Sequence, residues 1–216
     1  MIPDDFEIDK GILELQGKLS LPNNFFKKLL EEDDWSFIIK LHALIEAACT
    51  DLLMFHFDEP GLKNIISRIE LGNKSVGKLS FIKELDLLGE NYRKYIFSLS
   101  EWRNKFVHNV QNCNALLTDA VNLMEKGALK KFAIDFSPYE TTLQKFNNSK
   151  LGNLIDGSTN KQIDINNLIE RAKSNPKFHI WLGAYNLLIT IVDMQGYSNY
   201  LKRRKAVILL KDDSDD

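Results

Sequence analysis

The sequence predicts an all-α protein, an antiparallel helical bundle with additional C-terminal helices. Apolar residues recur every three or four positions along several long stretches, and this spacing places them on one face of a helix. Alternating patterns typical of strands are nearly absent. Glycine or proline interrupts the chain at short intervals, which favours antiparallel helices joined by short turns.

The clearest helices lie in the first half of the chain. A pair of asparagines precedes a short predicted helix over residues 25–32. The acidic pair Asp33–Asp34 then begins a long apolar-periodic stretch, where acidic groups suit the positive end of the helix dipole. We expect this long helix to run to about Phe57 and to end before Pro60.

Glycines punctuate the next three predicted helices. These helices are Leu62–Leu71, which ends at Gly72, Lys78–Leu88, which lies between Gly77 and Gly89, and Asn91–His108. Gly89 is expected to supply a left-handed C-cap. Aromatic residues recur at helical spacing in Asn91–His108, and core packing is favoured over a base-stacking platform for them.

The second half of the chain is less regular. A helix over Ala115–Lys126 is predicted to stop at Gly127, and it is followed by an ambiguous helix or strand within 128–146 and by an exposed loop over 147–161. Three more helices are predicted after the loop. They cover residues 165–173, a stretch from about Pro176 that is closed by Gly196, and Ser198–Leu210. The predicted parts of the chain are an N-terminal extension (1–33), a helical bundle (34–126), C-terminal helices packing on that bundle (127–211) and a disordered acidic tail (212–216).

Composition limits the classes of partner. The chain has 216 residues and a formal net charge of -2, so no global positive field attracts nucleic acid and any RNA contact must be local. Cys49 and Cys113 do not suggest a disulfide scaffold. The N-terminus lacks the pattern of a signal peptide, and the apolar run Ile180–Val192 is shorter than the ~20 residues of a membrane span. A cytoplasmic protein with no membrane partner is predicted.

Common catalytic and ligand-binding motifs are missing. The chain has no nucleophile elbow, no glycine-rich phosphate loop, no dinucleotide fingerprint and no His-Glu-x-x-His motif. No two of its four histidines share the spacing of metal ligands. We therefore predict neither a metal site nor a cofactor.

The segment Arg103–His108, at the end of the aromatic helix, combines groups that suit phosphate chemistry. On an ideal helix Arg103 and His108 are separated by about 7.5 Å of rise and about 140° of turn. The long arginine side chain can swing toward the groove beside His108. Asn104 lies one turn before His108 and can share its face.

Arginine and histidine together fit metal-free cleavage of RNA. In this reaction a 2′-hydroxyl attacks the adjacent phosphate and leaves a 2′,3′-cyclic phosphate and a 5′-hydroxyl. Arg103 would stabilise the charge on the phosphorane, and His108, of a residue type that titrates near pH ~6.5, would transfer a proton. A structural alternative stays open, in which Arg103 pairs with Glu101 or another acid and His108 caps the helix C-terminus.

The same residues carry a resemblance to a known family. Arg103–His108 resembles the R-N-x-x-x-H signature of the HEPN superfamily. Trp35–Leu53 resembles the first long helix of that fold, and Val76–Gly89 resembles the connecting helix of its mannitol operon repressor (MtlR-like) branch. The resemblance covers residues 34–126.

This resemblance implies a helical bundle that commonly forms a homodimer, with the two motifs facing each other across a two-fold axis. It also implies metal-independent endoribonuclease activity in many members, including toxins and antiviral defence effectors. By carry-over Arg103 and His108 would be catalytic and Asn104 supporting. A two-fold axis would supply His108 twice, once as base and once as acid.

A non-catalytic role is the alternative that the resemblance leaves open. MtlR-like members are regulatory or protein-binding modules that are not thought to cleave RNA. HEPN toxins regulated by a nucleotidyltransferase antitoxin often carry a tyrosine two residues after the histidine, where this chain has Val110. Regulation by modification of such a tyrosine is therefore not implied, although an antitoxin or another regulatory protein remains a candidate partner.

Two further groups of residues are candidates for supporting roles. Candidate RNA-binding residues are Lys105 and the cluster Lys202, Arg203, Arg204 and Lys205, although that cluster equally suits favourable charge on a final helix. His42 and Glu46 form an i, i+4 pair on the long helix and could orient the site from behind. The simpler interpretation of the pair is a solvated or internally paired polar stripe.

Overall fold

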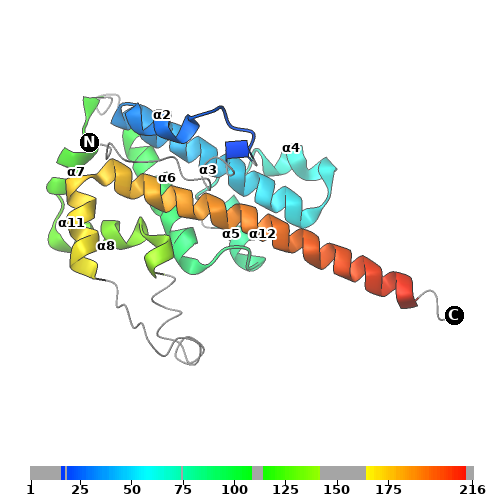
Figure 1. Ribbon diagram of the computed structural model, residues 1–216. Coiled ribbons are helices and arrows are strands. Elements are labelled where there is room, and N and C mark those ends of the chain that lie inside the picture. Colours follow the sequence, from blue (N-terminus) through cyan, green and yellow to red (C-terminus); the bar gives the residue numbers. More distant parts are fainter. Residues whose placement is uncertain (1–15, 18, 74, 109–113, 142–163, 213–216) are drawn as a thin grey trace.

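The computed structural model describes residues 16–212 apart from 18, 74, 109–113 and 142–163, with side chains described up to residue 196. Every regular element in these ranges is helical, which confirms the all-α class (Figure 1). The elements are α2 (Phe25–Glu31), α3 (Asp34–Phe57), the 3₁₀ turn η1 (Pro60–Leu62), α4 (Lys63–Ile66), α5 (Lys78–Glu84), α6 (Glu90–Val107), α7 (Leu117–Asn122), α8 (Lys126–Asp135), α11 (Ile165–Ser174) and α12 (Pro176–Asp212).

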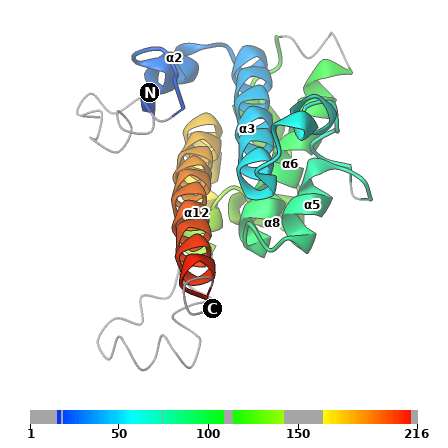
Figure 2. The same ribbon diagram turned by 90° about the vertical axis from the view of Figure 1, so that its right-hand side faces the viewer.

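The core forms where α12 and α6 pack against α3. Figures 1 and 2 show α12 lying alongside α3, while α6 contacts another side of α3. The side chains of Leu41, Ile45 and Leu187 are fully buried between these helices. The apolar cluster continues without a break from α2 to α12 across the boundary expected near residue 126. The division of the chain into parts stays a prediction.

The long helix α3 has the predicted bounds. Asp33 caps it, because the carboxylate accepts a hydrogen bond from the backbone N–H of Ser36 over 2.8 Å. At the other end Asp58 adopts a left-handed conformation with φ of 56°, and its N–H donates to the carbonyl of Met54. Local signals at both ends therefore suffice to define this helix.

The aromatic helix α6 also agrees with the prediction within one residue at each end. Tyr92, Tyr95, Trp102 and Phe106 are buried, so the aromatic stripe belongs to the core. The Tyr95 hydroxyl donates to the carbonyl of Ile180 over 2.8 Å and joins α6 to α12. The buried stripe fixes which face of α6 looks outward.

The helix predicted over Leu62–Leu71 is shorter in the structure, where α4 ends at Ile66. The carbonyls of Glu70 and Leu71 accept hydrogen bonds from the N–H groups of Lys78 and Leu79 at the start of α5. Those N–H groups have no partner within their own helix. The segment predicted to form the last turns of the Leu62–Leu71 helix therefore caps the start of α5 instead.

Three glycines do not end helices as predicted. Gly89 has φ of -59° and is the N-cap of α6, while Asp86, with φ of 49°, takes the left-handed position instead. Gly127 lies in the first turn of α8, which makes the ambiguous stretch helical as far as Asp135, while residues 142–146 of that stretch lie outside the described residues. Gly196 lies inside α12, which continues as one helix where two were expected. Glycine in a helix costs only about 1 kcal/mol relative to alanine, so a single glycine does not by itself end a helix.

The remaining expectations have mixed outcomes. α11 matches the helix predicted over 165–173, and α12 begins at Pro176 as expected. The predicted loop over 147–161 and nearly all of the acidic tail lie outside the described residues, as does Cys113. Cys49 is a free, fully buried thiol. Among the described residues no helix is long and apolar enough to cross a membrane.

Candidate functional site

The Arg103–His108 segment lies at the C-terminal end of α6, where its polar residues reach the molecular surface and Phe106 is buried. Arg103 is half-buried, whereas Asn104 and His108 are exposed. Nη1 of Arg103 donates a hydrogen bond to Oδ1 of Asn104 over 3.1 Å. This bond draws the guanidinium toward the helix face of Asn104, which His108 shares one turn later. The predicted swing of Arg103 toward the groove beside His108 stays a prediction.

The alternative to a catalytic role is that Arg103 pairs with an acid and that His108 caps the helix. Within the described residues Arg103 makes no ion pair with Glu101 or with another acid. His108 is the C-cap of α6, and its N–H donates to the carbonyl of Asn104 over 3.0 Å. The imidazole of His108 nevertheless remains exposed to solvent. Both side chains can therefore be reached from outside.

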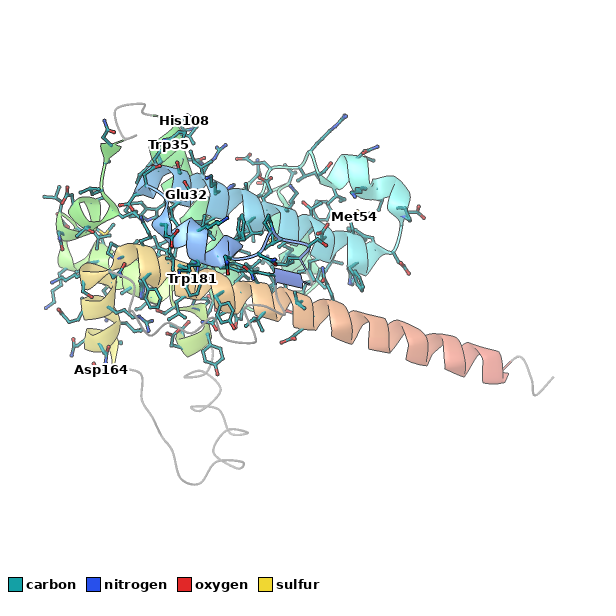
Figure 3. The ribbon with its side chains drawn as sticks, turned by 45° about the horizontal axis from the view of Figure 1, so that its top comes forward. Glu32, Trp35, Met54, His108, Asp164 and Trp181 are labelled. Carbon is teal, nitrogen blue, oxygen red and sulfur yellow. The ribbon has the colours of Figure 1, made fainter. Side chains whose placement is uncertain are left out.

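Trp35 fixes the end of α6 against the start of α3. Its Nε1 donates to the carbonyl of Phe106 over 3.2 Å. That carbonyl belongs to the last turn of the helix, where backbone acceptors have no partner within the helix. Figure 3 shows Trp35 and His108 at the same end of the molecule. The tryptophan thus holds the backbone from which His108 projects.

Lys105 is exposed on the same turn of α6, and its Nζ lies 5.1 Å from the ring centroid of Trp102. A cation over a tryptophan ring is favourable by roughly 0.5–1 kcal/mol at an exposed site. The contact restrains the lysine beside the Arg103–His108 segment while leaving its charge near solvent. Its predicted role in RNA binding stays a prediction.

A polar network, buried at Lys78 and Ser100 and half-buried at His42 and Glu46, lies between α3, α5 and α6. Nε2 of His42 is 3.2 Å from Oγ of Ser100, and Nδ1 is 4.0 Å from Oε2 of Glu46. Oε1 of Glu46 accepts a hydrogen bond from Nζ of Lys78 over 2.9 Å. Lys78 is only 1 % exposed, so this ion pair compensates a charge that burial would otherwise strongly disfavour.

His42 connects this network to the surface arginine. Burial lowers the pKa of His42, the carboxylate of Glu46 opposes that shift, and the charges of Arg103 and Lys78 add to it. A neutral imidazole on α3 therefore contacts α6, the helix that carries Arg103, at Ser100. The pair His42 and Glu46 is internally paired, and its predicted orienting role stays a prediction.

The basic cluster at Lys202–Lys205 is not brought to this site. These residues belong to the distal part of α12, where only the backbone is described. Figure 3 shows that this part of the helix extends away from the rest of the molecule, at the opposite end from His108. Contact of the cluster with an RNA strand held at His108 would require a strand that spans the molecule.

Sequence reasoning missed three residues that shape the site. Lys78 was assigned only to a helix start, Ser100 received no role, and Trp35 was noted only for its resemblance to a helix of a known fold. No local pattern identifies Lys78 as the partner of Glu46, because the two residues are 32 positions apart and Glu46 is only partly buried on α3. No local pattern identifies Trp35 as a donor to a helix 71 positions away.

A second polar cluster ties α8, α11 and α12 together. His179 is fully buried, and its Nε2 lies 3.0 Å from the carbonyl of Ala133. Its Nδ1 accepts from Nε of Arg171 over 3.1 Å, and that guanidinium also binds Glu140 over 2.7 Å. Burial, followed by the charge of Arg171, lowers the pKa of His179 to about 4. A neutral histidine enclosed in this way is a structural tie between helices.

The described residues contain no cluster of three or more His, Cys, Asp or Glu side chains that could hold a metal ion. Burial raises the pKa of the Cys49 thiol to about 12, so this cysteine is not a ready nucleophile. Of the chemistry-bearing groups considered so far, Arg103 and His108 combine solvent access with a defined arrangement.

Comparisons with known proteins do not assign a function to this chain. No protein-family model, no curated protein and no solved structure matches this chain.

Proposed function

We propose that this protein is a HEPN-type, metal-independent endoribonuclease that cleaves single-stranded RNA at the C-terminal end of α6. One observation carries the proposal. The C-terminal end of α6 carries Arg103, Asn104 and His108, each at least partly exposed, and the guanidinium of Arg103 is hydrogen-bonded to Asn104, which lies one turn before His108. A phosphodiester that approaches from solvent can meet both a cationic fork and an imidazole.

The proposed reaction is an internal transesterification. The 2′-oxygen forms a bond to phosphorus while the bond from phosphorus to the 5′-oxygen breaks. A base removes the proton of the 2′-hydroxyl, and an acid protonates the departing 5′-oxygen. Arg103 stabilises the charge on the phosphorane through the N–H groups that do not bind Asn104.

A homodimer is part of this proposal, because the reaction needs two proton-transfer groups and each chain offers one exposed histidine on this turn. A two-fold axis that pairs the ends of α6 would bring a second His108 to the same phosphate. Activity should then fall with dilution more steeply than protein concentration does. Light scattering over the same dilution series measures whether loss of activity coincides with dissociation.

Cleavage of RNA in the presence of EDTA tests the proposal. We expect the unaltered protein to cleave single-stranded RNA, and His108→Ala to reduce the rate by ~10² to 10⁴-fold, the contribution of a positioned acid or base. Arg103→Ala is expected to abolish detectable cleavage for electrostatic reasons. DNA of the same sequence should remain intact because it lacks the 2′-hydroxyl.

Matched controls separate the site from general damage. His56→Ala and Arg68→Ala remove one histidine and one arginine from other surface positions, where His56 is half-buried and Arg68 is exposed. Both should cleave at the rate of the unaltered protein. RNA that remains intact with every protein would refute the nuclease and leave the regulatory or protein-binding module as the proposal that fits.

The cellular role proposed with this activity is that of a toxin or an antiviral defence effector. Expression of the protein in growing cells should then arrest growth, and His108→Ala should relieve the arrest at equal protein level. Co-expression of a regulatory protein partner would relieve the arrest of the unaltered protein. Growth arrest that is equal with His108→Ala would contradict this role.

A further inference from the structure

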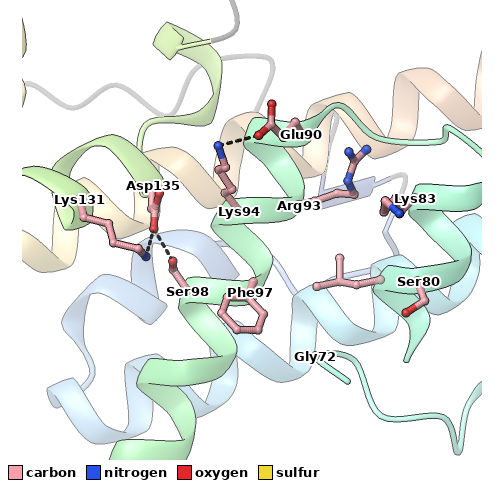
Figure 4. A pocket seen from close by; sticks show the side chains of 11 residues that line it. Gly72, Ser80, Lys83, Glu90, Arg93, Lys94, Phe97, Ser98, Lys131 and Asp135 are labelled. Atoms are coloured by element: carbon pink, nitrogen blue, oxygen red, sulfur yellow. Dashed lines mark hydrogen bonds and ion pairs between the residues drawn. The ribbon is translucent and has the colours of Figure 1, made fainter. Parts of the chain in front are cut away.

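A cavity of about 460 Å³ opens on the outward face of α6, between α5 and α8 (Figure 4). Phe97 and Ser98 of α6 lie at its base. Ser80 and Lys83 of α5 stand on one side, and Lys131 of α8 stands on the other. None of the roles assigned above to Arg103, His108 or the buried networks involves this cavity.

The walls of the cavity are apolar, and its rim is basic. Phe97 is half-buried and Leu79 is 9 % exposed, so both present carbon surface to the cavity. Lys83 and Lys94 are exposed at the edge, and Arg93 is half-buried beside them. An aromatic surface with cations at its edge is the combination that proteins use to stack a base and hold its phosphate.

The charges at the rim favour an anion. Four cationic side chains and two anionic ones, Glu90 and Asp135, line the cavity, which leaves a formal excess of two positive charges. Lys94 pairs with Glu90 over 2.7 Å, and Lys83 pairs over 2.8 Å with Glu84, which does not line the cavity. Lys131 pairs with the buried Asp135 over 2.5 Å. Ion pairs between two exposed side chains, as those of Lys83 and Lys94 are, are worth at most about 1 kcal/mol, so a phosphate can compete for these two cations.

The cavity and His108 lie on the same face of one helix. Lys94 and His108 are fourteen positions apart on α6, which corresponds to about 21 Å along the axis and a rotation of only about 40°. Lys105 stands between them on that face. A single strand that follows the helix surface would therefore pass from the cavity to His108 without crossing to another side.

We propose that this cavity binds one nucleotide of the single-stranded RNA substrate. The base lies against Phe97, and the neighbouring phosphates bind Lys83 and Lys94. The strand then follows α6 past Lys105 to His108. We call the path of the strand from the cavity along α6 to His108 the track. The position of its end at His108 rests on the proposed cleavage site, whereas nucleotide binding in the cavity is independent of cleavage.

One residue on the track opposes the strand. Glu101 is exposed on the same face of α6, between the cavity and His108. Its carboxylate repels a phosphate backbone that follows the helix. Glu101→Gln is therefore expected to strengthen RNA binding, which is an outcome that general damage to the fold would not produce.

Equilibrium binding tests the track separately from cleavage. The probe is an RNA of about 12 nucleotides, a length that falls in the usual range of single-strand sites, with every ribose methylated at its 2′-oxygen so that it cannot react. The double variant Lys83→Ala/Lys94→Ala should bind it more weakly. The slope of log affinity against log salt should also become shallower by about 1.4, the value for two lost phosphate contacts on a single strand.

Two further variants sharpen the measurement. Phe97→Leu keeps an apolar side chain but removes the stacking ring, and it should weaken binding by at least about five-fold. The control Lys63→Ala/Lys173→Ala removes two exposed lysines that do not line the cavity, and it should bind like the unaltered protein. Circular dichroism of each variant confirms that the helices are retained.

The outcomes distinguish this inference from the proposed function. Cleavage that proceeds with normal KM in the cavity variants overturns the track and leaves the nuclease standing. Binding that depends on the cavity in a protein that cleaves nothing supports the nucleotide site and refutes the nuclease. AMP serves as a free mononucleotide for comparison. If AMP binds as tightly as the RNA and loses binding in the same variants, the cavity binds free nucleotides, and the proposal that it holds part of an RNA strand is overturned.

Discussion

The buried histidine on α12 makes the stability of this protein depend on pH. Burial lowers the pKa of His179 to about 4 in the folded chain, against 6.5 for an unperturbed histidine. The unfolded chain therefore binds a proton at a higher pH than the folded chain does. The stabilising contribution of the neutral imidazole is complete above about pH 6.5, and it is lost as pH falls toward about pH 4.

The magnitude of this effect follows from the difference between the two pKa values. Each pKa unit corresponds to 1.36 kcal/mol, so the unfolding free energy should fall by about 3 kcal/mol over this interval because of His179 alone. His42, whose pKa is also lowered by burial, adds a smaller change of the same sign. Urea unfolding at a series of pH values from about 7 to about 4 measures the total.

The variant His179→Gln isolates the contribution of this one residue. A glutamine amide can donate to the carbonyl of Ala133 and accept from Arg171, but it does not titrate. The difference in unfolding free energy between the two proteins should shrink as pH falls. His56→Gln, at a half-buried position on α3, serves as the control. A difference that is constant with pH would refute the assignment of a neutral buried histidine.

Three substitutions test the helix geometry. Gly183→Ala should destabilise the protein by about 1–3 kcal/mol, since an added Cβ would lie 2.4 Å from the carbonyl oxygen of Phe136, and an unchanged melting temperature would contradict this packing. Gly196→Ala, on the same helix but with nothing within 4 Å of the added Cβ, should instead increase helix stability by about 1 kcal/mol, as measured by thermal circular dichroism. Asp33→Ala removes the cap of α3 and should cost about 1 kcal/mol in urea unfolding, whereas a cost near zero would show that Ser36 needs no partner.

Local sequence signals predicted the elements whose ends are defined locally. The acidic cap before α3 and the apolar spacing within it suffice to place that helix, because the first turn is stabilised by Asp33 itself. The aromatic spacing of α6 likewise predicted its buried face, and hence the outward position of Asn104 and His108. These two helices carry most of the candidate site.

The prediction failed where distant contacts decide the structure. The predicted helix after Leu62 stops early because Glu70 and Leu71 serve as acceptors for α5, an interaction between segments that local periodicity does not describe. Helix ends that depend on tertiary contacts are outside the reach of a local pattern.

The candidate site shows the same division. Its solvent-accessible side chains come from the C-terminal end of one helix, so their placement on that helix was predictable from spacing alone. The partners beneath them come from elsewhere, since Lys78 reaches Glu46 from 32 positions away and Trp35 reaches the end of α6 from 71 positions away. The cavity beside α6 escaped prediction for the same reason, because α5 and α8 contribute its rim.

The chemical ends of the RNA products test the central claim most directly. Unmodified single-stranded RNA incubated with the protein in EDTA should yield fragments that carry a 2′,3′-cyclic phosphate and a 5′-hydroxyl, and His108→Ala should yield almost none. Fragments with a 3′-hydroxyl and a 5′-phosphate, or the same fragments at the same rate from His108→Ala, would contradict transesterification by this histidine.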